Sequence, residues 1–286
     1  MSDETAKLIE MVPTDYYRDL VGDCPSLSVS IAKKLIIDCP LRAWKAHPKL
    51  GNKPDDPTDA MDFGTVVHSK LSGVATSICV IEADDFRTKA AQQKRDEARA
   101  NFQVPILARK IPHAEYAADA IRRCCGLSDP IFPLNGKWEQ VIVWESHGVL
   151  CRAMLDHLGD GYIFDLKVTS NANPSDGHLA GHIHDMGYDI QSAAYIEAVE
   201  SVRPELVGRV GFYFGFVEPT EDHLCSLVKL DEAMLELGRM RWRRAKRIWN
   251  ECLSTNHWPG YPPGVHLISP RPWDMQQEEM ESGNLH

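Results

Sequence analysis

The sequence predicts an α/β protein whose mixed central sheet contains an antiparallel meander of three strands and is flanked by helices. Three consecutive β-prone segments, residues 137–146, 149–158 and 162–170, are separated by the turn-like sequences HG and GDG. Connections this short join neighbouring antiparallel strands. Segments with apolar residues at helical spacing lie before and after these strands, so helices should cover the sheet.

We expect one domain over residues 1–286, because the chain shows no internal repeat and no obvious linker. Residues 26–130 should form a mainly helical first segment, and residues 137–258 an α/β core. A chain of this length can bury a full core, and its composition, 43% hydrophobic and 25% charged, is ordinary for a folded protein.

The first segment starts with a helical pattern that contains a break. Residues 26–46 open with serines suited to N-capping, continue with apolar residues at helical spacing and break near Cys39-Pro40. The following stretch, residues 47–60, is rich in Pro, Asp and Gly, which predicts a loop.

Three further helical patterns follow. A short helix over residues 61–73 should carry His68 inward, and two Ala-rich helices are expected at 85–101 and about 112–125. Together they should form a helical layer beside the sheet.

Beyond the meander the pattern alternates between helix and strand. A polar loop is expected over residues 171–188 and a helix over 189–202, followed by strands within 209–218 and 223–231. A long amphipathic helix should then cover residues 231–254.

The cysteines exclude some classes of protein. Eight stand at positions 24, 39, 79, 124, 125, 151, 225 and 252, and no two form a CxxC pair. This spacing argues against a zinc, redox or iron–sulfur protein, and we expect reduced, mostly buried thiols.

Hydropathy and charge give weaker indications. No apolar run approaches the roughly 18 residues of a membrane helix, and the N-terminus lacks the layout of a signal peptide, so we expect a cytoplasmic protein without membrane contact. The net charge of −10 is unusual for a DNA-binding protein, but residues 239–247 carry six cations. These form either a solvated helix face or a DNA-facing one.

The strongest chemical signal is the segment Asp165-Leu166-Lys167. Side chains alternate along a strand, so Asp165 and Lys167 share a face. Asp156 lies nine residues before Asp165, across the turn LGDG, and can approach it if the hairpin pairs in the obvious register. Two carboxylates brought together favour a hard cation between them, and Mg²⁺ prefers oxygen ligands.

A DxK sequence by itself is usually a surface ion pair that contributes little to stability. Here the strand is apolar, through residues such as Phe164 and Val168, and is therefore expected to be central in the sheet. Unpaired charges placed there are costly, so their presence indicates a function.

With these residues in place, the chain resembles a known family. The ordered set is His68 in FGTVVHSKL, Glu139 in KWEQVIVW, Asp156 in CRAMLDHL, Asp165 and Lys167 in FDLKVTS, and Gln191 with Tyr195 in QSAAY. This order resembles the RecB-like branch of PD-(D/E)xK nucleases, and more closely the RecE (exodeoxyribonuclease VIII) group, over roughly residues 26–258. The resemblance implies a restriction-endonuclease-like core.

The resemblance also implies roles in a metal site. Asp156 and Asp165 would bind Mg²⁺, for which Mn²⁺ could substitute, and the carbonyl of Leu166 would be a further ligand. His68 would be a ligand or a neighbour of the metal, although a histidine here could also be a core residue. Glu139 would bind the metal or a water; Glu145 is a competitor, but the HG that follows it places it near an exposed strand end.

The remaining catalytic roles follow from the same resemblance. Lys167 would orient or deprotonate the attacking water and help neutralise the scissile phosphate. Gln191 would bind the phosphate or that water, and Tyr195, one helical turn later, would position neighbouring groups.

The implied activity is Mg²⁺-dependent hydrolysis of linear double-stranded DNA in the 5′→3′ direction, processively, which leaves 3′ single strands for recombination. A single-strand annealing protein and a ring-shaped homo-oligomer are the implied partners. Alternatives are an endonuclease or single-strand nuclease with the same site, and a DNA-end-binding scaffold without catalysis.

Contacts to DNA can be suggested from residue types. Ser28 and Ser30, with Lys33, Lys34 and Arg42, could receive a terminal 5′ phosphate, because hydroxyls and a helix N-terminus form an anion site. Simple N-capping by one serine is an equal alternative. Arg152, a cation ahead of Asp156 in its strand, is expected to contact backbone phosphate.

Overall fold

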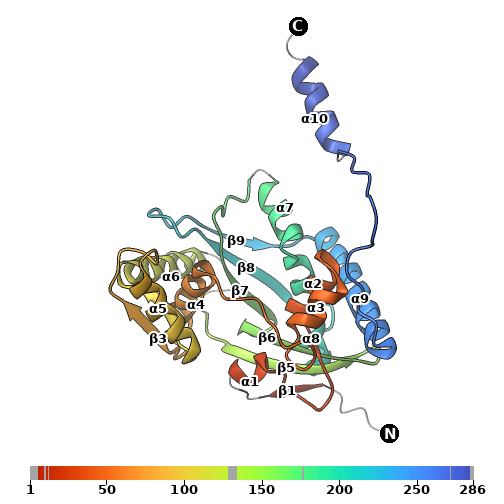
Figure 1. The fold of residues 1–286 in the computed structure, drawn as a ribbon, viewed down its shortest axis with the longest axis horizontal. Coiled ribbons are helices and arrows are strands. Elements are labelled where there is room, and N and C mark those ends of the chain that lie inside the picture. The colour runs from red at the N-terminus through yellow and green to blue at the C-terminus, as the bar shows by residue number, and fades with distance from the viewer. Residues whose placement is uncertain are drawn as a thin grey trace.

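In the computed structural model, a central mixed sheet separates two groups of helices (Figure 1). The structure describes residues 6–283 except 10, 12, 128–133, 176 and 271. Within these residues the sheet has seven strands. Their spatial order is β1 (Lys7–Ile9), β5 (Lys137–Ser146), β6 (Val149–Leu158), β7 (Tyr162–Val168), β8 (Gly211–Val217) and β9 (Cys225–Lys229), with the short β2 (Leu27–Ser28) also beside β6.

The strand directions make the sheet mixed. Strands β5, β6 and β7 pair antiparallel in sequence order, which confirms the predicted meander. Strand β8 then pairs parallel to β7 after a helical crossover, and β9 returns antiparallel to β8. The predicted fold class, α/β with a mixed sheet flanked by helices, is therefore confirmed.

The helices lie on both sides of this sheet. In chain order they are α1 (Pro13–Tyr17), α2 (Val29–Ile37), α3 (Pro40–Ala46), α4 (Asp59–Ser72), α5 (Lys89–Ala100), α6 (Ile111–Gly126), α7 (His178–Asp185), α8 (Tyr188–Val202), α9 (Glu232–Thr255) and α10 (Pro272–Gly283), with 3₁₀ turns η1 (Ala108–Lys110) and η2 (Pro204–Leu206). In Figure 1, α4, α5 and α6 lie on one side, and α2, α3, α8 and α9 on the other.

Local chemistry explains several helix ends. Pro40 occupies the first turn of α3, where its missing N–H is no loss, so the predicted break between α2 and α3 is confirmed. The hydroxyl of Thr58 accepts a hydrogen bond from the Met61 amide and caps α4, which ends at Gly73 with a φ of 72°.

Some elements escaped the sequence analysis. The expected loop over 171–188 contains α7, so that prediction was wrong in part. Leu179 and Ile183, four residues apart, bury one face of α7, but the histidines around them hide the periodicity. A small parallel sheet of β3 (Ile78–Ile81) and β4 (Val104–Leu107) was also not anticipated.

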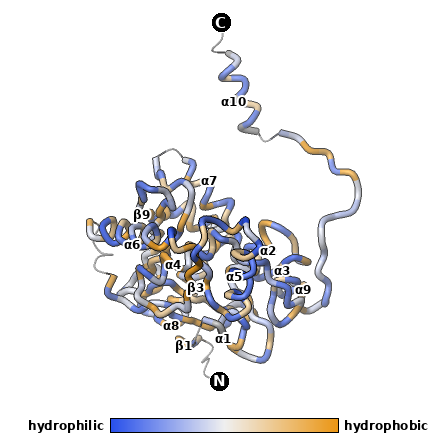
Figure 2. Tube along the Cα trace, turned by 60° about the vertical axis from the view of Figure 1, so that its left-hand side comes forward, coloured by the Kyte–Doolittle hydropathy of each residue, from blue (hydrophilic) through white to orange (hydrophobic). Residues whose placement is uncertain are grey.

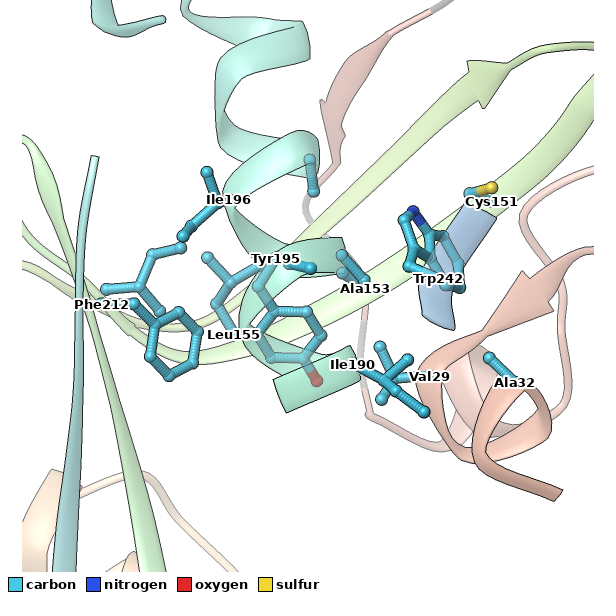
Figure 3. Packing of buried hydrophobic residues seen from close by; sticks show 14 of the residues in the cluster. Val29, Ala32, Cys151, Ala153, Leu155, Ile190, Tyr195, Ile196, Phe212 and Trp242 are labelled. Atoms are coloured by element: carbon cyan, nitrogen blue, oxygen red, sulfur yellow. The ribbon is translucent and has the colours of Figure 1, made fainter. Parts of the chain in front are cut away.

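The two faces of the sheet bury separate apolar clusters, and β7 contributes to both. Ile163 packs with residues of α2, α8 and α9, whereas Phe164 and Leu166 pack with residues of α4 and α6. Because side chains alternate, Asp165 lies on the same face as Ile163. Figure 3 shows the cluster on this face around α8, where Tyr195 lies close to Leu155 and Phe212.

The basic run on α9 is largely neutralised inside the fold. Arg241 binds Asp189 with an Nη1 to Oδ2 distance of 2.8 Å, and Lys246 binds Glu197 at 2.9 Å, in ion pairs that join α9 to α8. Arg239 and Arg243 pair with Glu236 on α9 itself. Four of the six cations are thus engaged, which favours a structural role for the run over a DNA-facing one.

The C-terminal residues extend away from the sheet and its helices. Figures 1 and 2 show α10 standing apart from the rest of the chain, after a connection that contains apolar residues. Val265, Leu267 and Ile268 in this connection are largely exposed.

Two expectations about chemical class can be compared with the structure. None of the eight cysteines, all of which the structure describes, forms a disulfide, and four of them are buried. No helix in the described part of the chain has both the length and the apolar character needed to cross a bilayer.

Candidate active site

Three carboxylates from neighbouring strands form a row across the sheet. On β5 and β6, the pairs Trp138 with His157 and Gln140 with Leu155 flank Glu139 and Asp156, so these two acids face each other. On β6 and β7, His157 pairs with Phe164, and the next positions in that register are Asp156 and Asp165. The hairpin therefore has the predicted register at its paired residues, and Asp156 and Asp165 are the positions just beyond them.

The sheet opens at this row. β7 pairs with β6 at His157 and Leu158, whereas β2 pairs with β6 further along, at Cys151 and Arg152. At the opening, Asp156 Oδ2 accepts a hydrogen bond of 2.9 Å from the Leu166 amide. The carboxylate thus replaces a backbone acceptor that the separating strands no longer supply.

Glu139 occupies an unusual backbone conformation in this row. Its φ of 51° lies in the left-handed region, which costs a residue with a side chain free energy and is frequent at functional sites. Burial raises the pKa of the Glu139 carboxyl, and Asp156 adds to this increase, whereas His68 opposes it. Glu145, the competitor on the same strand, is exposed near the turn that leads to β6.

Helix α4 places His68 between two of the carboxylates. Its Nδ1 lies 3.8 Å from Glu139 Oε1, and its Nε2 lies 3.7 Å from Asp156 Oδ1. Nε2 is buried without a hydrogen-bond partner, and the ring makes an edge contact with Trp138 at 5.8 Å between centroids. The structure therefore brings the predicted histidine to the predicted acids.

The donor set suits a hard divalent cation. Ligands of an octahedral ion with bonds of about 2.1 Å lie roughly 3–4 Å apart, which matches both separations from His68. Among the described residues, however, no three His, Cys, Asp or Glu side chains are grouped so that they could hold a metal ion. In this arrangement Asp156 Oδ2 accepts a hydrogen bond from the Leu166 amide, and Asp165 is bound by two side chains.

Those two side chains are Lys167 and Gln191. The Lys167 ammonium forms an ion pair with Asp165 Oδ1, and Gln191 Nε2 donates a 2.6 Å hydrogen bond to Asp165 Oδ2. The Asp165 side chain is 2% exposed, and burial raises its pKa to about 6 although Lys167 opposes this shift. Burial disfavours charge on Lys167 as well, but Asp165 and Asp156 outweigh it and raise the lysine pKa. Lys167 is therefore a cation here.

A tyrosine that the sequence analysis missed lies between two lysines. The ring centroid of Tyr188 is 4.9 Å from Lys167 Nζ and 4.6 Å from Lys33 Nζ, which are cation–π distances. Tyr188 is the first residue of α8 and precedes Gln191 by three residues, so the two lie on the same face of the helix. A predicted helix starting one residue earlier would have included it.

Lys33 belongs to this group of side chains. Its Nζ lies 3.5 Å from Gln191 Oε1. A Cβ on Gly187, whose φ is 64°, would lie 3.0 Å from Lys33 Cγ, so glycine allows the lysine stem to pass the start of α8. Burial, followed by the charge of Lys167, lowers the pKa of Lys33 to about 7.

The other residues suggested for phosphate binding have other partners. Ser28 is buried, and its hydroxyl forms a 2.9 Å hydrogen bond with the hydroxyl of Ser30. Although Ser28 is at the N-cap position of α2, its side chain makes no capping hydrogen bond. Lys34 pairs with Asp55, and Arg42 pairs with Asp38 at 3.0 Å. Of this set, Lys33 contacts the residues around Asp165.

Tyr195 and Leu166 are placed differently from Gln191. Tyr195 is 7% exposed and packs its ring against Phe212, so it supports the helix that carries Gln191. Leu166 buries its side chain on the opposite face from Asp165, and its amide binds Asp156.

The expectation that Arg152 contacts DNA phosphate is wrong. Arg152 is 3% exposed, and its Nη1 lies 2.9 Å from Asp19 Oδ1 and donates 2.6 Å hydrogen bonds to Ser26. Asp19 is fully buried, so it needs a cation, and Arg152 on β6 lies closer to it than Lys49, whose Nζ is 3.8 Å from Asp19 Oδ2.

We expect Arg152→Met to lower the free energy of unfolding by about 3 kcal/mol, because the buried Asp19 would lose its closer cation and keep only Lys49, 3.8 Å away. Urea denaturation measures this change. The exposed Arg42→Met should change stability by less than about 1 kcal/mol and serves as the control. If the Arg152 variant were as stable as the wild type but bound DNA more weakly, the original hypothesis of a phosphate contact would be supported.

Comparisons with known proteins agree with this fold. A family model described as a PDDEXK-like domain of unknown function, DUF3799, matches residues 28–268. A solved structure from Eubacterium rectale, described as a candidate exonuclease, has a similar fold with a TM-score of 0.56 and 17% sequence identity, over 90% of this chain and 97% of that one. No curated protein matches the chain.

Proposed function

The chain belongs to the DUF3799 family of PDDEXK-like domains, and we propose that it is a divalent-metal-dependent nuclease that hydrolyses phosphodiester bonds of DNA. The observation that carries this proposal is the row of Glu139, Asp156 and Asp165 at the sheet opening, with Lys167 beside Asp165. Charged groups are placed in an apolar sheet here at a cost in stability that a function explains.

The metal in this proposal is Mg²⁺, with Mn²⁺ as a substitute. Asp156 and Asp165 would hold it, with the Leu166 carbonyl, Glu139 and His68 as further or neighbouring ligands. When bound, such an ion polarises the phosphoryl oxygen, lowers the pKa of its water and stabilises the leaving oxygen. The carboxylate and imidazole separations around His68 support this assignment.

The side chains beside the carboxylates would handle the phosphate and the water. The Lys167 ammonium, held over the Tyr188 ring, would neutralise charge on the scissile phosphate and orient the attacking water. Gln191 already contacts both Asp165 and Lys33, so its side-chain amide lies where it can hydrogen-bond to the water or to a phosphate oxygen. Tyr195 would hold the helix that carries Gln191 in position against the sheet.

For the substrate we propose linear double-stranded DNA, digested processively from the 5′ end to leave 3′ single strands for recombination. The description of the Eubacterium rectale protein as a candidate exonuclease supports action at ends. We further propose that the protein forms a ring-shaped homo-oligomer and acts with a single-strand annealing protein. Residues 26–130 and 137–258 would belong to a single domain.

A digestion assay on linear duplexes labelled separately at the 5′ and the 3′ end tests this function. We expect early release of the 5′ label with Mg²⁺ present, and resistance of covalently closed circles. Cutting of closed circles would favour an endonuclease, and preference for unpaired strands a single-strand nuclease. Binding to DNA ends without any digestion would favour a non-catalytic scaffold.

Lys33 allows a prediction about pH. Because its pKa is about 7, its charge is lost as the pH rises through neutrality. If Lys33 binds a DNA phosphate, affinity measured in EDTA should fall about tenfold between about pH 6 and about pH 8. Lys33→Arg keeps its charge throughout this range and should flatten the profile. If the affinity of the wild type and of this variant changed with pH in the same way, Lys33 would be excluded as a phosphate-binding residue.

A further inference from the structure

A pocket of about 660 Å³ is lined by Val168, the residue after Lys167, and by Tyr188. One wall is the end of β7, Val168 to Ser170, with His182 of α7 and Tyr188 of α8. The facing wall comes from α4, β4 and η1, together with the loop that carries Phe86. Neither the metal ligands nor the basic run on α9 accounts for this pocket.

The pocket and the proposed catalytic lysine share a side chain. The Tyr188 ring lines the pocket and also lies 4.9 Å from Lys167 Nζ. Val168, the next residue after Lys167, contributes to the same wall. A strand whose phosphate lies at Lys167 can therefore place an adjoining nucleotide in the pocket.

The walls combine aromatic rings with cations. Phe86 and Tyr188 line the pocket, with the largely buried Phe63 behind them, and Arg109 and Lys110 of η1 line the same space. Lys110 Nζ lies 5.9 Å from the Phe63 ring centroid. Stacking surfaces next to positive charges are the usual means of binding single-stranded nucleic acid, because every base has a π face and every linkage a negative charge.

Two acidic residues also line the pocket, but both have cationic partners. Asp59 Oδ1 lies 3.4 Å from Arg99 Nη2 and 3.9 Å from Arg95 Nη1. Asp85 Oδ2 lies 3.6 Å from Arg87 Nε. These pairs reduce the repulsion that a nucleotide phosphate would otherwise meet at the rim.

The volume limits what can enter. Pockets of roughly 300–1,000 Å³ accept ligands of drug size, which corresponds to one or two nucleotides and excludes a duplex. The apolar wall of β4, with Pro105 and Ile106 buried, favours a flat base over a hydrated sugar–phosphate group.

We propose that this pocket binds an unpaired nucleobase of the strand being cut, stacked on Phe86, with the adjoining phosphate on Lys110 and Arg109. This inference rests on the proposed nuclease function. It implies that one or two terminal nucleotides leave the duplex before cleavage. Unpairing a terminal base is inexpensive, and stacking on an aromatic side chain offsets it.

Binding can be followed without cleavage. The probe is a linear duplex with a short unpaired tail that contains 2-aminopurine, added to the full-length protein in EDTA. Stacking on an aromatic ring quenches this base. We expect quenching with the wild type, and with Phe86→Ala we expect less quenching and an affinity about 5- to 100-fold weaker.

Three controls make the result specific. Phe86→Trp should restore both readouts, because it restores a stacking surface. Phe102→Ala, which truncates an 82% exposed phenylalanine outside the pocket, should match the wild type. Thermal unfolding of each variant shows whether the fold is retained; if Phe86→Ala unfolds, Lys110→Gln replaces it and should weaken tail binding in the same assay.

The outcomes separate this inference from the proposed function. If the wild type digests DNA but Phe86→Ala and Lys110→Gln bind and quench like the wild type, the pocket inference is wrong and the nuclease proposal stands. If the wild type quenches the probe through Phe86 but digests no DNA with Mg²⁺, the pocket is supported and the nuclease proposal fails.

Discussion

Lys167→Ala is expected to lower the rate of DNA digestion by about 10²- to 10⁴-fold while the protein remains folded. The ammonium is held by Asp165 and over the Tyr188 ring, which fixes it beside the carboxylate row. The fold should survive because Asp165, whose pKa burial already raises to about 6, can take up a proton when its partner is removed. Initial rates on an end-labelled linear duplex measure the effect.

A matched control lies two strands away in the same sheet. Lys229 of β9 is exposed and contacts the Tyr213 ring, so Lys229→Ala should digest DNA at the wild-type rate. Circular dichroism and thermal unfolding verify that both variants fold. Full activity in a folded Lys167→Ala protein would refute the proposed site.

Removal of divalent metal is expected to have an effect of similar size. EDTA should reduce digestion to background, and excess Mg²⁺ should restore it. Mg²⁺ alone should also stabilise the DNA-free protein, by about 2.7 kcal/mol when its concentration is 100 times the dissociation constant. The reason is that a cation relieves the repulsion among Glu139, Asp156 and Asp165, and calorimetry at increasing Mg²⁺ would detect it.

Variants on a single strand test whether this stabilisation comes from the carboxylate row. Glu139→Gln should reduce the Mg²⁺-dependent rise in unfolding temperature, because Glu139 faces Asp156. Glu145→Gln, six residues along the same strand and exposed, should leave it unchanged. An unchanged rise in Glu139→Gln would exclude Glu139 as a ligand, and digestion that persists in EDTA would exclude the metal.

Much of the architecture could be predicted because it depends on local pattern. Strand alternation and two short turns were sufficient for the β5–β6–β7 meander and for placing Asp165 and Lys167 on one face. Helix α7 was missed because it has few periodic apolar residues, and the β3–β4 sheet because each of its strands is only four residues long. Leu179 and Ile183 are buried only after the rest of the cluster is assembled.

The parts of the site that were predicted incorrectly depend on long-range partners. Arg152 resembles a DNA-binding cation until Asp19, 133 positions earlier, is found buried against it. The basic run on α9 similarly becomes structural through Asp189 and Glu197 on α8. A charged side chain looks the same in sequence whether its counter-ion is a phosphate or a buried carboxylate.

By itself, the sequence determined the β5–β6–β7 meander and the shared face of Asp165 and Lys167, because these follow from side-chain period and from turns of a few residues. Only the tertiary structure decided that His68 meets Glu139 and Asp156, and that Lys33 and Gln191 meet beside Asp165. These contacts join segments up to 158 residues apart. Packing of helices on the sheet sets such distances, and no local pattern encodes them.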